Sequence, residues 1–411
     1  PQAPGRMVGD LWLLDEAGNL IAECLGLEGR QTTLEALLRR PAKDHTGSWL
    51  HRIDWADADT PAAGTDSAPW LVFADHGGQG DALAAHRTAH GMPTVRVTPG
   101  AAFERLDGTH YRIDPQNPAD MAALLDTAFP GQVPFRIAYL WGLDARSGEA
   151  PALESTIAGA CVPFLHLIAA AARRGAAAPA LAVVTRGAWD AEPAQAPLSG
   201  LARTAALEHP ELRVRVIDID PHGDAPPADA LVRDLGADDG EERVAYRGGS
   251  RRVARLVRMA PPAATGPLPV RADGAYLLLG GLGGLGRFMA HRLVARGARD
   301  LTLVSRSPAG ADAAAFVDEL RGHGATVRVC RADLAVGAEV AAAIAEAASD
   351  RPLAGVVHAA GVLDDGVLLH LDAARLSHAL SAKTVGLAHL HEQTRGLPLE
   401  YFCGCSSLSA L

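Results

Sequence analysis

The chain has 411 residues, which is enough for two or three domains of typical size. Asp and Glu number 48 against 38 Lys and Arg, and the formal net charge of −10 argues against a nucleic-acid-binding protein, because such proteins carry a basic surface. The apolar fraction of 48% and the charged fraction of 21% are typical of a globular protein rather than a disordered one.

Five cysteines, odd in number and widely spaced, do not form a disulfide framework and indicate a reducing, cytoplasmic environment. The most apolar run, residues 157–172, contains Pro163 and His166 and is too short to cross a bilayer, so we expect a buried helix. The start at Pro1 and the apolar end at Leu411 are those expected of a segment cut from a longer chain.

The first forty residues contain a β-hairpin pattern. Apolar residues 12–14 and 20–22 flank a stretch rich in Asp, Gly and Asn, which favours a turn. A short helix is predicted over residues 32–39, and residues 41–46 are predicted to be a linker.

From residue 49 to residue 259, short apolar strands alternate with helix-like stretches, and this alternation predicts a parallel sheet covered by helices on both faces. The predicted strands are 70–73, 94–97, 137–140, 181–184, 214–217, 243–246 and 252–257, and the predicted helices are 81–90, 118–129, 155–174 and 200–208.

The alternation restarts after a Pro/Ala-rich linker at residues 260–264. The predicted strands are then 276–279, 301–304, 327–329, 355–358 and 401–403, and the predicted helices are 285–296, 311–322, 338–348 and 372–393. The fold class is therefore α/β, with two tandem doubly wound parallel sheets and a short β segment at the N-terminus.

The strongest functional signal is the run LGGLGGLG at residues 279–286, between a predicted strand and a predicted helix. Its glycines satisfy both GxGxxG and GxxxGxG spacings, and the candidate cofactor-binding residues are Gly280, Gly281, Gly283, Gly284, Leu285 and Gly286. Glycines permit a tight turn and close approach to a pyrophosphate, which then lies at the helix N-terminus. The alternative is a glycine-rich turn without a ligand.

Ser305 and Arg306 follow the next strand. An Asp or Glu in this place would bind the ribose 2′-hydroxyl of NAD, whereas Arg can pair with the 2′-phosphate of NADP. We therefore expect NADPH as the cofactor. A solvated surface arginine is the alternative.

Two later strands also end in candidate cofactor contacts, because ligands of open α/β sheets bind at these ends. Asp333 and Leu334 follow the third strand, where a carboxylate can accept from the adenine amino group. The small residues after His358, which are Ala359, Ala360 and Gly361, leave room for a ribose. Asp333 as an ordinary helix N-cap is the alternative.

Taken together, six segments resemble the ketoreductase domain of modular polyketide synthases, an extended short-chain dehydrogenase/reductase. They are LGGLGGLG (279–286), LVSR (303–306), ADL (332–334), VVHAAGVLDDGVL (356–368), LSAKTVGLAHLHEQT (380–394) and CSS (405–407). Four earlier segments are similar to that domain's structural subdomain, a degenerate Rossmann-like copy without catalytic residues: GSWLHRIDW (47–55), AYLWGLD (138–144), LSGLARTAALEHP (198–210) and ERVAYRGGSRRVARLVR (242–258).

The resemblance implies a domain organisation. Residues 47–259 would be the structural subdomain, 260–270 a linker, and 271–411 the cofactor-binding catalytic subdomain, truncated before the catalytic Tyr. Residues 1–40 are similar to the C-terminal end of a dehydratase, followed by the linker 41–46. The first α/β region is not expected to bind a cofactor, because its glycine spacing differs and Asp75 would repel a phosphate.

The resemblance also implies catalytic roles. Lys383 would hydrogen-bond the nicotinamide ribose and lower the pKa of a catalytic Tyr, and Ser407 would hydrogen-bond the substrate carbonyl. The family's Tyr and an Asn follow that Ser, beyond Leu411, so the chain by itself is expected to lack the proton donor. Lys383 as a surface lysine and Ser407 as a strand-end hydroxyl are the alternatives. His358 and His389 are expected to be core or helix residues.

The segment Leu363-Asp364-Asp365 is associated in this family with B-type reductases, which form the D-configured alcohol. An Asx-type turn is the alternative. Two departures from the family pattern are Leu279, where a Thr is usual, and the Phe402–Cys405 segment before the serines.

The expected function is NADPH-dependent reduction of a β-ketoacyl thioester, carried on an acyl carrier protein, to a β-hydroxyacyl thioester in polyketide biosynthesis. Adjacent synthase domains, with a dehydratase upstream, and homodimerisation through the parent synthase are implied. No metal, nucleic-acid or membrane partner is expected. The alternatives are a stand-alone short-chain dehydrogenase and a non-catalytic structural or truncated pseudo-reductase region.

Overall fold

The computed structural model describes residues 6–14, 20–30, 50–62, 67–129, 134–148, 150–260, 269–308 and 310–407. The predicted turn at 15–19, the helix at 32–39, the linker at 41–46 and most of the linker after residue 260 lie outside these residues. The chain divides into two compact units: residues 1–52 with 256–265, and residues 53–255 with 266–411.

The predicted hairpin is confirmed. Strands β1 (Arg6–Leu14) and β2 (Leu20–Arg30) pair antiparallel, with a register shift between Gly9 and Leu11. Trp12 lies opposite Glu23 and donates a hydrogen bond from Nε1 to Oε1 of that glutamate at 2.9 Å. The strands are longer than the apolar pattern predicts, because pairing continues through their polar residues.

A ten-stranded sheet follows, in the order β3-β12-β11-β10-β9-β8-β4-β5-β7-β6. The strands are β3 (His51–Asp57), β4 (Trp70–Phe73), β5 (Thr94–Pro99), β6 (Glu104–Arg105), β7 (His110–Ile113), β8 (Arg136–Tyr139), β9 (Ala180–Arg186), β10 (Arg215–Ile219), β11 (Arg243–Arg247) and β12 (Ser250–Arg258). The seven strands from β11 to β7 in this order pair parallel, whereas β12 pairs antiparallel with β11 and β6 pairs antiparallel with β7.

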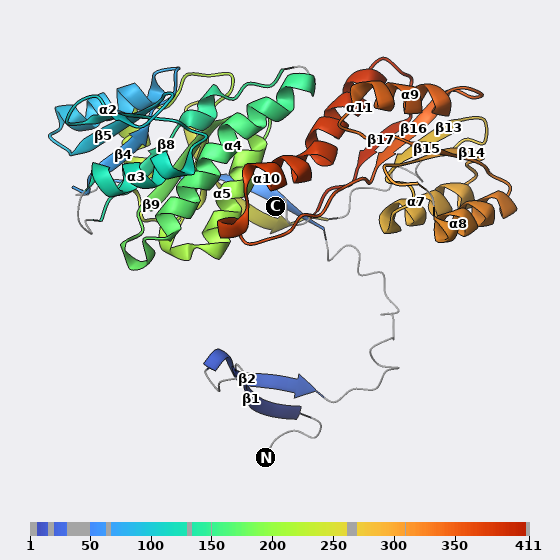
Figure 1. Ribbon diagram of the computed structural model, residues 1–411, viewed down its shortest axis with the longest axis horizontal. Coiled ribbons are helices and arrows are strands. Elements are labelled where there is room, and N and C mark those ends of the chain that lie inside the picture. The colour runs from blue at the N-terminus through green and yellow to red at the C-terminus, as the bar shows by residue number, and fades with distance from the viewer. Residues whose placement is uncertain are drawn as a thin grey trace. The chain divides into compact units, whose positions relative to one another are not determined.

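Among the described residues, the helices that cover this sheet are α2 (Gln79–Ala89), α3 (Pro118–Ala128), α4 (Ala150–Ala172) and α5 (Ala196–Glu208), which Figure 1 labels, together with α6 (Ala228–Gly236). Helices α3, α4 and α5 share one apolar core that includes Met121 and Phe164. Helices α2 and α6 share a second core that includes Leu83 and Leu231. Because each sheet face has its own core, the predicted double coverage is confirmed.

Helix α4 is longer than the apolar run in the sequence indicates. Its stretch Ala152–Ala172 has a mean hydropathy of 1.7. By length and composition alone, this stretch could cross a membrane. However, 61% of its most apolar window is buried inside the protein, with Phe164 and Ile168 in the core. The helix is therefore a core helix, as predicted.

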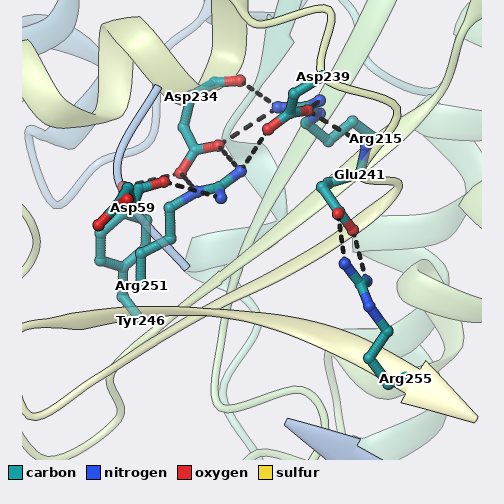
Figure 2. Close-up of polar contacts among 8 residues, drawn as sticks. All are labelled: Asp59, Arg215, Asp234, Asp239, Glu241, Tyr246, Arg251 and Arg255. Carbon is teal, nitrogen blue, oxygen red and sulfur yellow. Dashed lines mark hydrogen bonds and ion pairs between the residues drawn. The ribbon is translucent and has the colours of Figure 1, made fainter. Parts of the chain in front are cut away.

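A buried group of charges joins α6 to β10 and β12 (Figure 2). Asp234, whose side chain is fully buried, accepts hydrogen bonds from Arg251 Nε at 2.9 Å and from the Tyr246 hydroxyl at 2.7 Å. Arg215 donates to the carbonyl oxygen and to Oδ1 of Asp234, and Asp239 pairs with both arginines. We call these five residues the Asp234 network.

The second sheet has five strands, all parallel, in the order β15-β14-β13-β16-β17. They are β13 (Ala275–Leu279), β14 (Asp300–Ser305), β15 (Thr326–Arg331), β16 (Leu353–His358) and β17 (Tyr401–Gly404). Helices α7 (Gly284–Ala295) and α8 (Ala311–Gly322) cover one face, and α9 (Gly337–Ala347) and α11 (Gly386–Thr394) cover the other (Figure 1). The strand order reverses between β13 and β16, which is where open α/β sheets bind ligands.

The structure corrects two details of the prediction. Strands β3, β6 and β7 and helix α6 were not predicted, because they are short or polar and lack the apolar runs of the central strands. The helix predicted over 372–393 is divided into α10 (Ala373–Leu380), a π-helical segment (Ser381–Val385) and α11. The other predicted strands and helices that lie within the described residues are confirmed within a few residues.

Candidate functional site

The glycine-rich loop joins β13 to α7 in a turn that requires glycine. Gly280 has a φ of 75°, in the left-handed region, and a Cβ there would lie 2.7 Å from the backbone nitrogen of Ala360. A Cβ on Gly281 would lie 2.9 Å from Cδ2 of Leu303, and one on Gly286 would overlap the carbonyl oxygen of Gly280. The turn therefore packs closely against the loop after β16 and against Leu303 of β14, and the first turn of α7 packs closely against Gly280.

The first turn of α7 presents free space to a ligand. A Cβ on Gly284 would meet no atom within 4 Å. The N–H groups of Gly284, Leu285 and Gly286 precede the first intrahelical hydrogen bond, in which Arg287 N donates to the Gly283 carbonyl at 2.8 Å. Such N–H groups, at the positive end of a helix dipole, form the arrangement that binds phosphate.

Leu279 does not prevent the loop from forming. The backbone nitrogens of Gly280 and Gly281 both donate to the Val304 carbonyl, at 2.9 and 3.2 Å. These bonds hold the loop to β14 without the hydroxyl that the resemblance leads one to expect at residue 279.

A cleft of about 220 Å³ opens at the carboxyl ends of the central strands. It is lined by residues from every predicted cofactor segment, among them Gly280, Gly283, Ser305, Arg306, Asp333, Leu334, Ala359, Ala360 and Gly361. The structure thus brings these candidates together at the point where the strand order reverses. The other predicted cofactor residues do not line the cleft: Gly281, Gly284, Leu285, Gly286, His358 and Lys383.

Arg306 is exposed at the rim of the cleft. Its carbonyl oxygen accepts a hydrogen bond from Arg331 Nε at 3.2 Å, and Ser305 Oγ donates to the Ser307 carbonyl at 3.1 Å. These bonds fix the backbone after β14 and bring the Arg331 guanidinium to the Arg306 carbonyl. Within the described residues, no carboxylate pairs with the Arg306 guanidinium, which leaves it available for an anionic ligand.

Asp333 is not the N-cap of α9, which is Val336. Its Oδ1 accepts a hydrogen bond from Ala335 N at 3.0 Å, and its own N–H donates to Glu339 Oε2 at 2.6 Å. The carboxylate therefore forms an Asx-type turn at the edge of the cleft, beside Leu334.

The two histidines near the site are structural. The His358 ring is buried and its Nε2 lies 3.0 Å from the Ala382 carbonyl oxygen. Burial lowers the pKa of His358, so the ring is neutral at neutral pH. His389 is also buried, and its ring lies against Gly337, where a Cβ would come within 3.0 Å.

Lys383 lies in the π-helical segment, in line with the frequent occurrence of such segments at functional sites. A Cβ on Gly361 would lie 3.2 Å from Cε of Lys383, so the lysine reaches the loop after β16. Ser407 follows β17, whose continuation is tied to β16 by the bond from Cys405 N to the His358 carbonyl at 2.8 Å. Both residues therefore belong to the same edge of the sheet as the cleft.

The segment Leu363-Asp364-Asp365 does not form an Asx-type turn through Asp364. Instead, Asp364 Oδ1 accepts from Arg375 Nε at 2.8 Å, and His378 Nδ1 lies 3.4 Å from Oδ2. The bond from Arg375 holds the pKa of Asp364 below its ordinary value. Leu363 remains 79% exposed, and Asp365 is also exposed.

In the ten-stranded half, the corresponding loop between β4 and α2 does not offer free amides, because the side chain of Asp75, within the loop, binds them. The buried Asp75 carboxylate accepts hydrogen bonds from Gly80 N at 2.7 Å and from Gln79 N at 3.3 Å. It thus takes the amides of the first turn of α2 that a phosphate would need.

The two halves share a core. The side chain of Leu368, only 1% exposed, is part of the core around α4, and its backbone nitrogen donates to Glu208 Oε2 at 2.7 Å. Ser377 on α10 donates to Glu154 on α4. Helix α4 also contacts the π-helical segment, so the first half helps to position the segment that carries Lys383.

Residues 274–411 match the family described as KR domain, and residues 69–235 match the family described as beta-ketoacyl synthase-like, N-terminal. The chain is 33% identical to polyketide synthase GfsA of Streptomyces halstedii over 89% of its length. It is 31% identical to spectinabilin polyketide synthase system protein NorA of Streptomyces orinoci over 93% of its length. The chain is homologous to polyketide synthase modules. It spans only 5% and 19% of the length of these two relatives.

Solved ketoreductases have the same fold. The structure titled A1-type ketoreductase aligns with a TM-score of 0.73 and 29% identity, and covers 89% of this chain and 75% of that one. An A-type ketoreductase from a modular polyketide synthase gives 0.73 and 28%, with the same coverage. Because this alignment covers far more than residues 274–411, the likeness to ketoreductases extends into the ten-stranded half as well.

Sequence reasoning missed several residues that shape the site. Arg375 lies outside the segments singled out in the sequence, and the contacts of Glu208 and Leu368 could not be predicted, because each contact joins residues that are distant in sequence. For Asp75 the sequence predicted only that its negative charge would repel a phosphate. Its hydrogen bonds to the amides of α2 could not be predicted.

Proposed function

We propose that the chain is the ketoreductase region of a cytoplasmic, multidomain polyketide synthase. It would reduce a β-ketoacyl thioester on an acyl carrier protein to the β-hydroxyacyl thioester, with NADPH. The observation that supports the proposal is the glycine turn from Gly280 to the start of α7, because Gly280 and Gly283 line the same cleft as Arg306 and Asp333. Homology to polyketide synthases supports the substrate class.

The residues present fit NADPH. The first turn of α7 would bind the pyrophosphate, Arg306 the 2′-phosphate, and Asp333 the adenine amino group. NADPH, when bound, supplies the hydride. Lys383 would hold the nicotinamide ribose and lower the pKa of the proton donor, and Ser407 would hydrogen-bond the ketone oxygen.

We further propose the domain organisation and the stereochemistry. Residues 47–259 would be the structural subdomain, 271–411 the catalytic one and 1–40 the end of a dehydratase, in a synthase that forms homodimers. Leu363, Asp364 and Asp365 support a B-type outcome, the D-configured alcohol. Similar solved structures of 28–29% identity include A-type ketoreductases, and chiral chromatography of the reduced product tests the B-type proposal against that alternative.

NADPH binding by this chain is the first test, because it needs no proton donor. Titration by fluorescence or calorimetry should give saturable binding that is tighter for NADPH than for NADH. Turnover is then measured with a β-ketoacyl N-acetylcysteamine thioester, on the synthase polypeptide that carries these residues. Absence of NADPH binding, or binding without turnover by the synthase, would reject ketoreduction and leave a structural role.

A further inference from the structure

We propose that Arg375 is a positioning residue that fixes the loop of residues 363–367 and thereby sets which face of the ketone receives the hydride. The loop begins at the cleft, which Gly361 and Val362 line. Arg375 lies on α10, outside the segments that carry the cofactor and the catalytic candidates.

The guanidinium of Arg375 uses all three of its nitrogens on this loop and its continuation. Nε donates to Asp364 Oδ1 at 2.8 Å, and Nη2 donates to the Asp365 carbonyl at 2.8 Å and to the Asp364 carbonyl at 3.2 Å. Nη1 donates to the His370 carbonyl at 3.0 Å. The planar guanidinium binds one carboxylate and three backbone carbonyl oxygens at once, and it thereby fixes the backbone conformation of the loop. A lysine ammonium cannot make the same set of planar, directional hydrogen bonds.

Further contacts hold the start of α10, the guanidinium and the end of the loop. The backbone nitrogen of Arg375 donates to Asp372 Oδ1 at 2.9 Å, which caps α10. Gly366 lies against the guanidinium, where a Cβ would come within 2.9 Å of Nη2. Leu368 ends the loop in the core of the ten-stranded half, and Glu208 accepts its backbone N–H.

This arrangement determines what the loop presents to a substrate. Because Asp364 is turned toward Arg375 and the carbonyl of Asp365 is held, the side chains of Leu363 and Asp365 project to the exterior. An acyl chain entering beside Gly361 would meet these side chains. Without the bonds from Arg375, the loop would still be anchored at Gly361 and at Leu368, but the backbone of residues 363–367 would no longer be held in one conformation.

The inference rests on the proposed ketoreduction, and the test separates the two. Arg375→Gln and Arg375→Lys are made in the synthase polypeptide, with Arg395→Gln, an exposed arginine at the end of α11, as the matched control. A β-ketoacyl N-acetylcysteamine thioester is reduced with NADPH, and both alcohol enantiomers are quantified by chiral chromatography. The affinity for NADPH and the hydrogen–deuterium exchange of residues 363–370 are measured on the same variants.

We expect the enantiomer ratio to fall by about tenfold or more in Arg375→Gln, which corresponds to ~1.4 kcal/mol between the two transition states. Faster exchange in residues 363–367 and unchanged NADPH affinity should accompany it, and Arg375→Lys should restore the ratio only in part. A merely structural role would lower total turnover and leave the ratio unchanged, and that result would overturn the inference. If the unaltered protein does not reduce the ketone, the proposed function itself fails.

Discussion

At the scale of single residues, the specificity for the phosphorylated cofactor depends on Arg306. Arg306 lies at the rim of the cleft, and no carboxylate within the described residues pairs with its guanidinium. We predict that Arg306→Asp weakens NADPH binding by at least about tenfold, since a charge-assisted pair becomes a repulsion. NADH binding should change far less.

Fluorescence titration of both nucleotides checks this prediction. Arg292→Asp makes the same charge change on the last turn of α7 and should leave both affinities unchanged. Equal losses of NADPH and NADH affinity in Arg306→Asp would contradict the assignment of the 2′-phosphate to Arg306.

The glycine loop gives a second prediction at this scale. A Cβ on Gly286 would overlap the Gly280 carbonyl and lie 2.7 Å from Cα of Gly281, and both are backbone atoms that cannot move aside cheaply. Gly286→Ala should therefore cost roughly 2 kcal/mol or more of stability and abolish NADPH binding.

Gly284→Ala is the matched variant, because its Cβ would meet no protein atom within 4 Å. It should keep or slightly raise the stability, since Ala favours helix. Urea unfolding measures the stability of both variants, and NADPH titration measures their affinity for the cofactor. Equal stability of the two variants would show that the turn does not require glycine at residue 286.

Sequence reasoning reached the residues whose role depends on spacing, and it missed those whose role depends on distant contacts. The glycine run and Arg306 were found because a strand, a turn and a helix place them in order. Arg375 could not be found, because an arginine on an amphipathic helix carries no local sign of the loop that it holds. The Asx turn of Asp333 cannot be told from a helix cap in the sequence, since both use the same side chain.

At the scale of elements, the end of β16 is joined to the π-helical segment by His358. Its pKa is lowered from 6.5, mainly by burial, so the unfolded chain takes up a proton at a higher pH than the folded chain does. Stability should therefore decline as the pH falls below about 6.5, until the pH reaches the lower pKa of the folded state. The buried ring must then accept a charge.

We predict that His358→Gln, whose amide can still donate to the Ala382 carbonyl, shows a smaller loss of stability between pH 7.5 and pH 5.5 than the wild type. His323→Gln, at the exposed end of α8, should keep the wild-type slope. Some slope should remain in every variant, because burial also lowers the pKa values of His110 and His166. Urea midpoints followed by circular dichroism at both pH values test this, and an unchanged slope in His358→Gln would contradict it.

The elements themselves were predictable where the sheet is parallel and buried, because such strands are continuous apolar runs, as in Trp70–Phe73. The edge strands β3 and β6 are largely exposed and polar, so they carry no such run. The division of the helix after β16 could not be predicted from the sequence either, because the π-helical segment has the same apolar spacing as the α-helices on both sides of it. Tertiary contacts with α4 accompany that division.

At the scale of the whole molecule, the two α/β halves are expected to unfold together. Leu368 of the second half lies in the core of the first, and Glu208 and Glu154 of the first half accept hydrogen bonds from Leu368 and Ser377 of the second. A change that destabilises one half should therefore also release the segment that carries Lys383.

The Asp234 network (Figure 2) tests this coupling, because it lies entirely in the first half and none of its residues lines the cofactor cleft. Removing the buried carboxylate leaves Asp239 as the one carboxylate that pairs with Arg215 and Arg251 in the part of the chain that the structure describes, so Asp234→Ala should cost on the order of 3–5 kcal/mol. Arg255→Ala, which breaks the exposed pair with Glu241 drawn in the same figure, should leave the stability nearly unchanged.

Calorimetry should show one unfolding transition for the two halves, and Asp234→Ala should shift it to lower temperature. Saturating NADPH should raise the transition temperature of the wild type and of Asp234→Ala, because the ligand binds only the folded state. Melting of the second half is followed independently by loss of bound NADPH fluorescence, which should coincide with the calorimetric peak. Two separate peaks, with only the NADPH-insensitive one shifted by Asp234→Ala, would mean that the ten-stranded half folds on its own and does not position Lys383 through α4.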